Sequence, residues 1–162
     1  MKHNSAMTDY KVIIPEEAYS LVKFRQEDMP GIAFINASLK SFENHIVFPW
    51  HLSLMLNFND LIDNGMPSSD ERGLVDPFFD KVEMDLKGDS VKPNGLFLAR
   101  ITWNGTREFI WRIHEPEIAN KYLRTVIRQK KSPRPFDFRM DHDPEWKLAQ
   151  WHLKNAQEWK IH

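Results

Sequence analysis

Apolar and polar side chains alternate in several stretches of the chain, and each alternation predicts a strand. Residues 18–25 and 31–37 are strand-like runs joined by the polar loop 26–30, so we expect an N-terminal β-hairpin. A clearer strand is predicted over residues 50–58, where apolar residues recur with a period of two. These residues are Leu52, Leu54, Leu56 and Phe58. One face of this strand is therefore expected in the core.

A second hairpin is predicted by Asn104-Gly105, because both residues tolerate the positive φ angles of a two-residue type I′ turn. The pairing that follows places Trp103 opposite Thr106 and Phe97 opposite Arg112 on one side of the sheet. The other side is the expected core face. It holds Leu96, Leu98, Arg100, Phe109, Trp111 and Ile113. Arg100 is thus expected among apolar neighbours.

Apolar residues at helical spacing predict two longer helices. The first begins at a capping box, in which Ser68 accepts from the Glu71 amide and the Glu71 carboxylate reaches back. Pro77 is expected to kink or restart this helix, and Gly88 is expected to end it. The second helix begins at Pro116. The buried positions of the two helices are Val75, Phe78, Phe79, Val82, Leu86, Ile118, Tyr122, Leu123, Val126 and Ile127.

The C-terminal part is expected to hold one more strand and a short helix. Phe136, Phe138 and Met140 alternate with charged residues, which predicts the strand. Asp143-Pro144 has the residue types of a helix N-cap and first helical position, so the last helix is expected to begin there.

From residue 49 to 141 the predicted order is strand, helix, strand, strand, helix, strand. This is the split βαβ order, and it predicts an α+β fold, a ferredoxin-like βαββαβ sandwich in which two helices cover one face of the sheet. The N-terminal β-hairpin and the C-terminal helix are then additions to it. We expect residues 1–17 to form an N-terminal tail and residues 18–162 a single α+β domain.

Composition narrows the class of protein. The chain has 162 residues, enough for one domain with a sizeable core, and its 22 basic and 23 acidic residues nearly cancel. It has no cysteine, which excludes disulfides, thiolate zinc sites and thiol catalysis. No signal peptide or membrane span is indicated, so a cytoplasmic location is expected. Residues 60–92 are mainly acidic and residues 96–134 mainly basic, which we interpret as two solvated helices of opposite sign.

Several segments carry a family resemblance. They are Leu-Phe-Leu-Ala-Arg-Ile-Thr at 96–102, Gly-Thr-Arg-Glu-Phe at 105–109, Asp-Pro-Glu-Trp at 143–146, and residues 50–58 followed by Asn-Gly-Met-Pro at 64–67. Together they resemble the bacterial domain-of-unknown-function family 695 over most of the chain after about residue 18. Some relatives look to be joined to a domain similar to the ribonuclease E inhibitor. The resemblance implies a regulatory or binding role and supplies no catalytic residues.

Metal-ligating residue types occur at Asp141-His142-Asp143, with His114 as a further candidate. Adjacent residues of an extended segment point to opposite sides, so these residues do not easily converge on one ion. Asp143 is also explained as a helix cap. We therefore favour a structural interpretation, and the sequence points to no cofactor or bound metal.

Polar residues on the strands are the other candidates. Arg100 and Glu108 have the chemistry of an anion clamp and a proton-transfer group, but the predicted pairing sends them to opposite faces. His51 on the polar face of its strand is a possible acid or base. Each also has a structural interpretation, because a half-buried arginine more often pairs with an internal carboxylate and a lone histidine lacks a nucleophile.

Nucleic acid is disfavoured as a partner. Ferredoxin-like sheets can stack bases on exposed aromatic residues, and Phe97 and Trp103 share a predicted face with Arg112. Residues 107–113 lack the pattern of an RNA-recognition strand, however. We expect the aromatic residues to contact other parts of the chain, another protein or a second copy. The tryptophans near the C-terminus are expected to close either the core or an interface. They are Trp146, Trp151 and Trp159.

The leading hypothesis is a non-catalytic binding or regulatory module, with Arg100, Arg112, His51 and Trp103 as candidate binding residues. Its expected partner is another protein or a second copy of the chain, and not a membrane. One alternative is a hydrolase, possibly metal-dependent, with His114, His142 and Asp141 at the end of the sheet. Another is an RNA-associated regulator that binds a nuclease.

Overall fold

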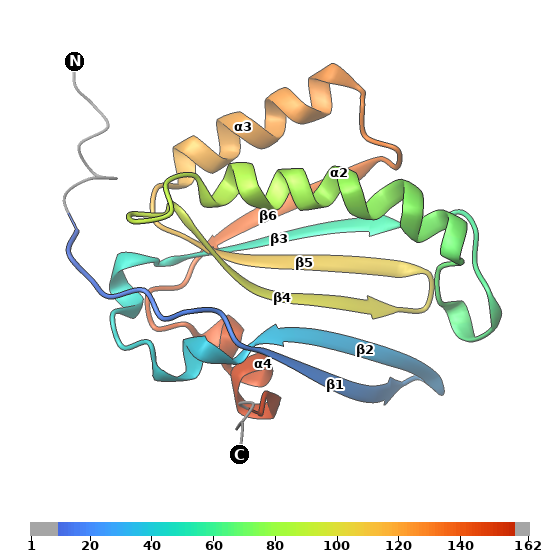
Figure 1. The fold of residues 1–162 in the computed structure, drawn as a ribbon, viewed down its shortest axis with the longest axis horizontal. Helices are drawn as coiled ribbons and strands as arrows, with labels where there is room; N and C mark the ends of the chain where they lie inside the picture. Colours follow the sequence, from blue (N-terminus) through green and yellow to red (C-terminus); the bar gives the residue numbers. More distant parts are fainter. Residues whose placement is uncertain (1–9, 158–162) are drawn as a thin grey trace.

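A computed structural model describes residues 10–157, and in these residues six strands form one antiparallel sheet (Figure 1). The strands are β1 (Tyr19–Gln26), β2 (Met29–Asn36), β3 (Trp50–Asn57), β4 (Gly95–Trp103), β5 (Thr106–Ile113) and β6 (Phe136–His142). Their order in the sheet is β1-β2-β4-β5-β3-β6. The predicted α+β class is confirmed. The order of the whole sheet differs from that of a four-stranded ferredoxin-like sandwich, because the N-terminal hairpin pairs with β4 and adds two strands.

The sheet separates two apolar cores. On one face, α2 (Ser69–Lys87) and α3 (Pro116–Gln129) pack on alternate residues of β3, β5 and β6. On the other face lie α4 (Gln150–Asn155) and short 3₁₀ turns at Ala37–Ser41, His45–Val47 and Lys147–Ala149. A further 3₁₀ turn, Asp63–Gly65, precedes α2. The α4 side of the sheet is less completely covered than the α2 side. The candidate site lies on the α4 side.

Both predicted hairpins are present, and their turns are tight. Asn104 and Gly105 have φ angles of 49° and 78°, as the type I′ turn requires. In the N-terminal hairpin, Glu27 and Asp28 also have positive φ, at 52° and 63°. Gln26 therefore pairs directly with Met29, and the predicted five-residue loop is wrong. Strand β2 begins two residues earlier than the apolar pattern indicated.

A β-bulge between Phe97 and Ala99 corrects the predicted faces of β4. Beyond the bulge, Phe97 pairs with Trp111 and faces α2, whereas Leu96 and Leu98 face the α4 side. The predicted pairing of Phe97 with Arg112 is therefore wrong. The predictions for the outer half of the hairpin are confirmed, since Trp103 pairs with Thr106 and Ile101 with Glu108.

Only one of the two hydrogen bonds predicted for the capping box of α2 is present. The Ser68 hydroxyl accepts from the Glu71 amide at 3.1 Å. The Glu71 carboxylate does not reach back, because it accepts from Arg134 Nη2 at 2.6 Å and from the Asn59 amide at 2.9 Å. The helix continues through Pro77 without a restart. It ends at Gly88, which has a φ of 72°.

The two ends of the described chain pack on the α4 side. Tyr10, which the sequence assigned to a tail, is buried against Phe48, and its hydroxyl donates to the Pro93 carbonyl at 2.6 Å. The helix predicted to begin at Asp143-Pro144 starts only at Gln150. Asp143 does act as a cap, since its carboxylate accepts from the amides of Lys147 and Leu148. Residues 1–9 and Trp159 lie outside the described residues.

Candidate functional site

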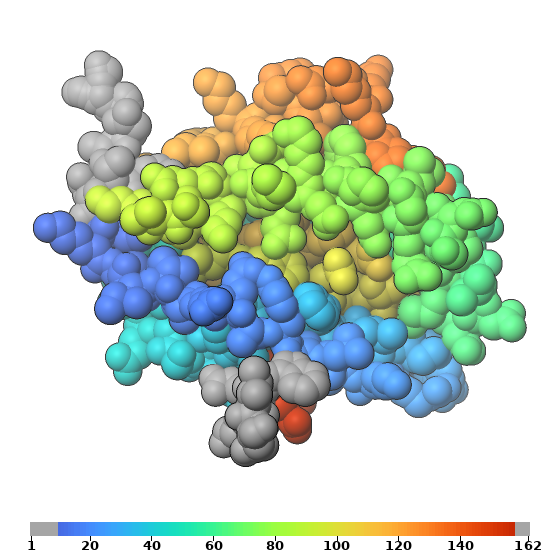
Figure 2. All heavy atoms as spheres, in the orientation of Figure 1, coloured from blue at the N-terminus to red at the C-terminus, as the bar shows by residue number. Residues whose placement is uncertain are grey.

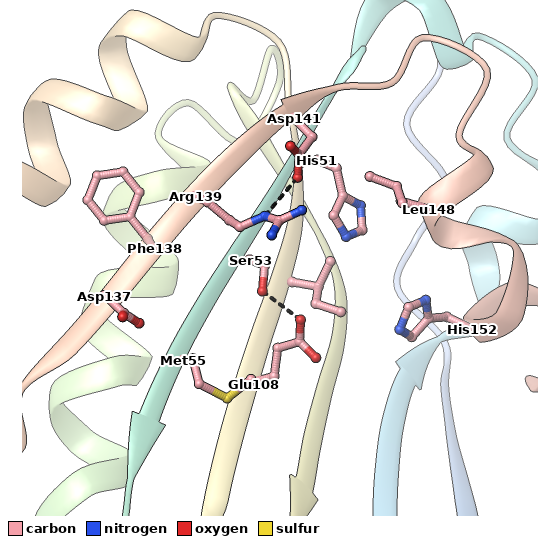
Figure 3. A pocket seen from close by; sticks show the side chains of 11 residues that line it. His51, Ser53, Met55, Glu108, Asp137, Phe138, Arg139, Asp141, Leu148 and His152 are labelled. Carbon is pink, nitrogen blue, oxygen red and sulfur yellow. Dashed lines mark hydrogen bonds and ion pairs between the residues drawn. The ribbon is translucent and has the colours of Figure 1, made fainter.

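A groove of about 490 Å³ lies on the α4 side of the sheet, over β5, β3 and β6 (Figure 3). We call it the α4-side groove. Its floor consists of side chains that alternate with the apolar residues facing α2, and its wall is the start of α4. The residues that line it are His51, Ser53, Met55, Glu108, Ile110, Asp137, Phe138, Arg139, Asp141, Leu148 and His152. The strict alternation of β3 thus places His51, Ser53 and Met55 in the groove.

Ser53 and Glu108 lie at the middle of the floor. The Ser53 hydroxyl donates to Glu108 Oε2 at 2.5 Å across the β3–β5 pair (Figure 3). No basic side chain lies within ion-pair distance of Glu108 among residues 10–157. Because a carboxylate has lone pairs for several donors, Glu108 retains acceptor capacity toward a ligand.

His51 lines the groove and is held by Arg112, which lies beneath the groove floor. Arg112 Nη1 lies 3.1 Å from His51 Nδ1. A guanidinium has no acceptor, so Nδ1 must accept this bond and the proton of the neutral ring lies on Nε2. Burial, followed by the charge of Arg112, lowers the pKa of His51 to about 4. At neutral pH His51 is therefore an uncharged hydrogen-bond donor.

Arg112 is fully buried and bound on several sides. Nη1 donates to Asp143 Oδ2 at 3.0 Å, and Nη2 donates to the Asp143 carbonyl at 2.6 Å. The Phe48 carbonyl accepts from both Nε and Nη2. The guanidinium carbon also lies 4.6 Å from the centre of a Trp146 ring. With its donors occupied inside the protein, Arg112 supports the groove and does not offer a surface contact.

Charges along β6 give the groove a negative balance. Arg139 is paired with Asp141 at 3.1 Å, whereas no base lies within ion-pair distance of Asp137 in the described chain. His152 is almost buried, and this burial lowers its pKa to about 4, so it is uncharged at neutral pH. Glu108 and Asp137 are thus the uncompensated charges of the groove.

Aromatic residues extend the groove toward the hairpin turns. A neighbouring hollow of about 740 Å³ shares Met55 and Glu108 with the groove and is also lined by Phe24, Trp103 and Trp151. Phe24 and Trp151 meet edge to face, with ring centres 5.9 Å apart. The Trp103 indole donates to the Gln26 carbonyl at 3.0 Å. One continuous surface therefore joins a carboxylate to three aromatic rings, and it also includes Arg25, whose guanidinium donates to the Asp28 carbonyl at 2.8 Å.

Comparison with known families assigns the chain. Residues 19–151 match the family of unknown function DUF695. The chain belongs to this family. The match begins at the first residue of β1 and ends inside α4, so the DUF695 segment includes the N-terminal hairpin and most of the groove lining. A comparison with curated proteins and one with solved structures each gave no significant match.

The metal candidates of this DUF695 domain are dispersed. Asp141 faces the α4-side groove, while the His142 ring packs against Trp50, tilted by 46°, on the other face of the sheet. His114 Nδ1 lies 2.5 Å from the Val47 carbonyl, and its ring packs against Tyr10. The structure does not bring them together, and residues 10–157 contain no group of three acidic or histidine side chains able to hold a metal ion.

The candidate binding residues of the DUF695 domain fall into two places. His51 and Trp103 line the joined hollows on the α4 side, and Arg112 lies beneath them. Arg100 is on the opposite face, over the ring of Phe34. Sequence reasoning missed Ser53, Asp137 and His152 as parts of the site, and it named Trp151 only as a residue of a core or an interface. Ser53 was visible in the alternation of β3, whereas the two α4 residues reach the groove only through the tertiary fold.

None of the helices in residues 10–157 is long and apolar enough to cross a membrane.

Proposed function

We propose that this protein is a non-catalytic binding module that receives an extended, positively charged segment of a partner protein in the α4-side groove. The observation that carries the proposal is Glu108, a carboxylate with no basic partner among the described residues, in the middle of an open sheet face. Asp137 adds a second negative charge on the edge strand β6, where it pairs with Met55 of β3 on the side opposite Glu108. A lysine or arginine side chain would complement both charges.

The aromatic end of the surface fits the same ligand. Trp103, Trp151 and Phe24 lie beyond Glu108 along the joined hollows. Aromatic faces attract ammonium and guanidinium groups and also pack against their aliphatic stems. Strand β6 pairs with β3 on one side and with no other strand in residues 10–157, so its outer edge can hydrogen-bond an extended chain.

The geometry gives little support to acid–base or nucleophilic catalysis. Ser53 donates to Glu108, and no imidazole of residues 10–157 is hydrogen-bonded to it as an activating base. His51 carries its proton on Nε2, and its low pKa makes it a weak base. The hydrolase alternative also needs His114, His142 and Asp141 together, and these lie apart.

We also infer that β3, α2, β4, β5, α3 and β6 form a ferredoxin-like unit with the hairpin as an extension. In support, the adjacent strands β4-β5-β3-β6 are joined through two crossover helices on one face. A regulatory role, including the RNA-associated alternative, stays a prediction. The negative balance of the groove favours a protein segment over RNA.

The test is an NMR titration of ¹⁵N-labelled protein with a short peptide of alternating arginine and threonine. We expect saturable shifts at the Trp103 and Trp151 indole signals. Glu108→Gln keeps the shape of the side chain and removes its charge, so it should weaken binding by about tenfold. The matched control is Glu117→Gln in the first turn of α3, far from the groove, which should leave binding unchanged.

Two results would contradict the proposal. One is equal binding of a peptide with glutamate in place of arginine, or no saturable binding of either peptide. The other is turnover in a hydrolase screen that His51→Gln or Ser53→Ala abolishes, since this would make the groove catalytic.

A further inference from the structure

A separate hollow, of about 330 Å³, lies on the other face of the sheet, between α2 and the N-terminal hairpin. Figure 2 shows this side of the molecule, where the hollow opens between α2 and the hairpin strands. Three arginines line it: Arg72 from α2, Arg100 from β4 and Arg107 from β5. We call it the arginine recess. Asp76, one turn after Arg72 on α2, is its only lining carboxylate.

Arg107 is fixed at the base of the recess. Only 5% of its surface is exposed. Nη1 donates to Asp76 Oδ1 at 2.6 Å, Nε donates to the Thr102 hydroxyl at 3.1 Å, and the guanidinium carbon lies 5.0 Å from the centre of the Phe58 ring. Because Thr102 Oγ accepts from Arg107, its own proton is available to another acceptor. The pair with Asp76 uses the one negative charge of the lining.

Arg100 and Arg72 have no such counterion. Neither guanidinium lies within ion-pair distance of a carboxylate in residues 10–157. Arg100 instead stands over the Phe34 ring, with its guanidinium carbon 5.1 Å from the ring centre. Glu83 is close enough for the charge of Arg100 to lower its pKa, but burial and the nearby charges of Glu17 and Asp80 outweigh this attraction and raise the pKa of Glu83 to about 7. Glu83 is therefore only partly ionised at neutral pH and neutralises Arg100 incompletely.

The charges of the recess repel one another. Burial is the first cause that lowers the pKa of Arg107, and the nearby charges of Arg100 and Arg72 lower it further, while Asp76 raises it. Arg72 is exposed to solvent, but Arg107 is buried, so the like charges of Arg100 and Arg72 disfavour its charged form and an anion in the recess would relieve this repulsion. The recess is therefore electrostatically complementary to a negatively charged ligand.

We propose that the arginine recess binds a small organic oxyanion, a phosphate or carboxylate joined to an apolar body. The arginines and the Thr102 hydroxyl supply donors to the oxyanion, and guanidinium groups match its geometry. Leu21, Ile62 and Met66 give the rest of the recess an apolar wall. Leu21 and Ile62 are each 59% exposed, so a ligand would cover apolar surface that now faces water.

The test is a calorimetric titration with three probes that share one ring: phenyl phosphate, benzoate and the uncharged benzyl alcohol. We expect saturable binding of one or both anions and none of benzyl alcohol. Preference between phenyl phosphate and benzoate identifies the anionic group. Arg100→Gln should weaken anion binding by about tenfold, because it removes a charge that is bound to no internal carboxylate.

Controls separate the recess from general charge. Arg128→Gln removes a surface charge from α3 and should leave binding unchanged. Arg72→Gln is a second test on another element and should also weaken binding. No saturable anion binding, or equal binding by the Arg100→Gln and wild-type proteins, would overturn the proposal. Glu108→Gln should not affect these titrations, so the recess and the α4-side groove succeed or fail separately.

Discussion

At the scale of single residues, the hydrogen bond between Arg112 and His51 determines the chemistry of His51 in the α4-side groove. Its direction follows from donor and acceptor types alone, since the guanidinium can only donate. The sequence places His51 on the polar face of its strand, where it is a possible acid or base, although a lone histidine without a paired nucleophile favours a structural role. Its hydrogen bond with Arg112 of β5 shows that His51 is an uncharged donor.

We therefore predict that His51 does not titrate near its ordinary pKa of 6.5. Its pKa of about 4 in the folded protein means that protonation favours the unfolded chain. The stabilisation is complete above about pH 6.5 and is lost as the pH falls toward 4, by at most about 1.4 kcal/mol per pH unit for one histidine. NMR of the imidazole signals between these pH values checks the titration.

The stability measurement needs a variant, because His152 also has a pKa of about 4 and contributes in the same direction. His51→Gln keeps an oxygen that can accept from Arg112 and removes the titratable ring. Its free energy of unfolding should fall less steeply between pH 6.5 and 4 than that of the wild type. An inflection of the His51 signals near pH 6.5 would contradict the lowered pKa of His51.

At the scale of elements, the start of α2 shows how far local sequence reasoning reaches. The cap by Ser68 was predictable, because its partner lies three residues away. The actual partner of Glu71 was not, because Arg134 lies 63 residues further along the chain. Glu71 satisfies Arg134 and the Asn59 amide, while the Ser68 amide donates to the Asp60 carbonyl. The long-range ion pair between Glu71 and Arg134 thus takes the place of the second hydrogen bond of the predicted capping box.

The two adjacent serines at this helix start give a matched test. Ser68→Ala removes the acceptor of the Glu71 amide and should destabilise the protein by about 1 kcal/mol. Ser69 is the first helical residue and is exposed, so Ser69→Ala should change the free energy of unfolding by no more than about 0.5 kcal/mol. Urea unfolding of both variants measures the difference. Equal effects would show that the cap contributes nothing specific.

The bulge in β4 marks another limit of prediction for elements. The alternation and the Asn104-Gly105 turn correctly indicated the outer pairs of the hairpin. One extra residue between Phe97 and Ala99 then exchanges the faces of every side chain before it. A run of apolar residues carries no sign of such a shift, since either register buries them. Phe97 and Arg112 consequently end on opposite faces.

At the scale of the whole molecule, the number and kind of strands followed from alternation, whereas the coverage of the second face did not. Segments that looked like loops in the sequence close that face, including the 3₁₀ turns around Phe42 and Phe48 and the region of Trp146. Their apolar residues are too few and too irregular in spacing to form a periodic signal. The groove exists because this covering stops before it reaches Glu108 and Asp137.

Arg112 holds this covering to the sheet, and we predict that its loss affects the stability of the whole molecule. It joins β5 to the Phe48 carbonyl and to Asp143 in the C-terminal segment. Arg112→Met would leave the nearly buried Asp143 carboxylate without its ion pair, at a cost of about 3–5 kcal/mol. Arg139→Met breaks a solvent-exposed pair and should cost less than about 1 kcal/mol. Denaturant unfolding checks both variants, and comparable losses would mean that Arg112 does not hold the α4 side to the sheet.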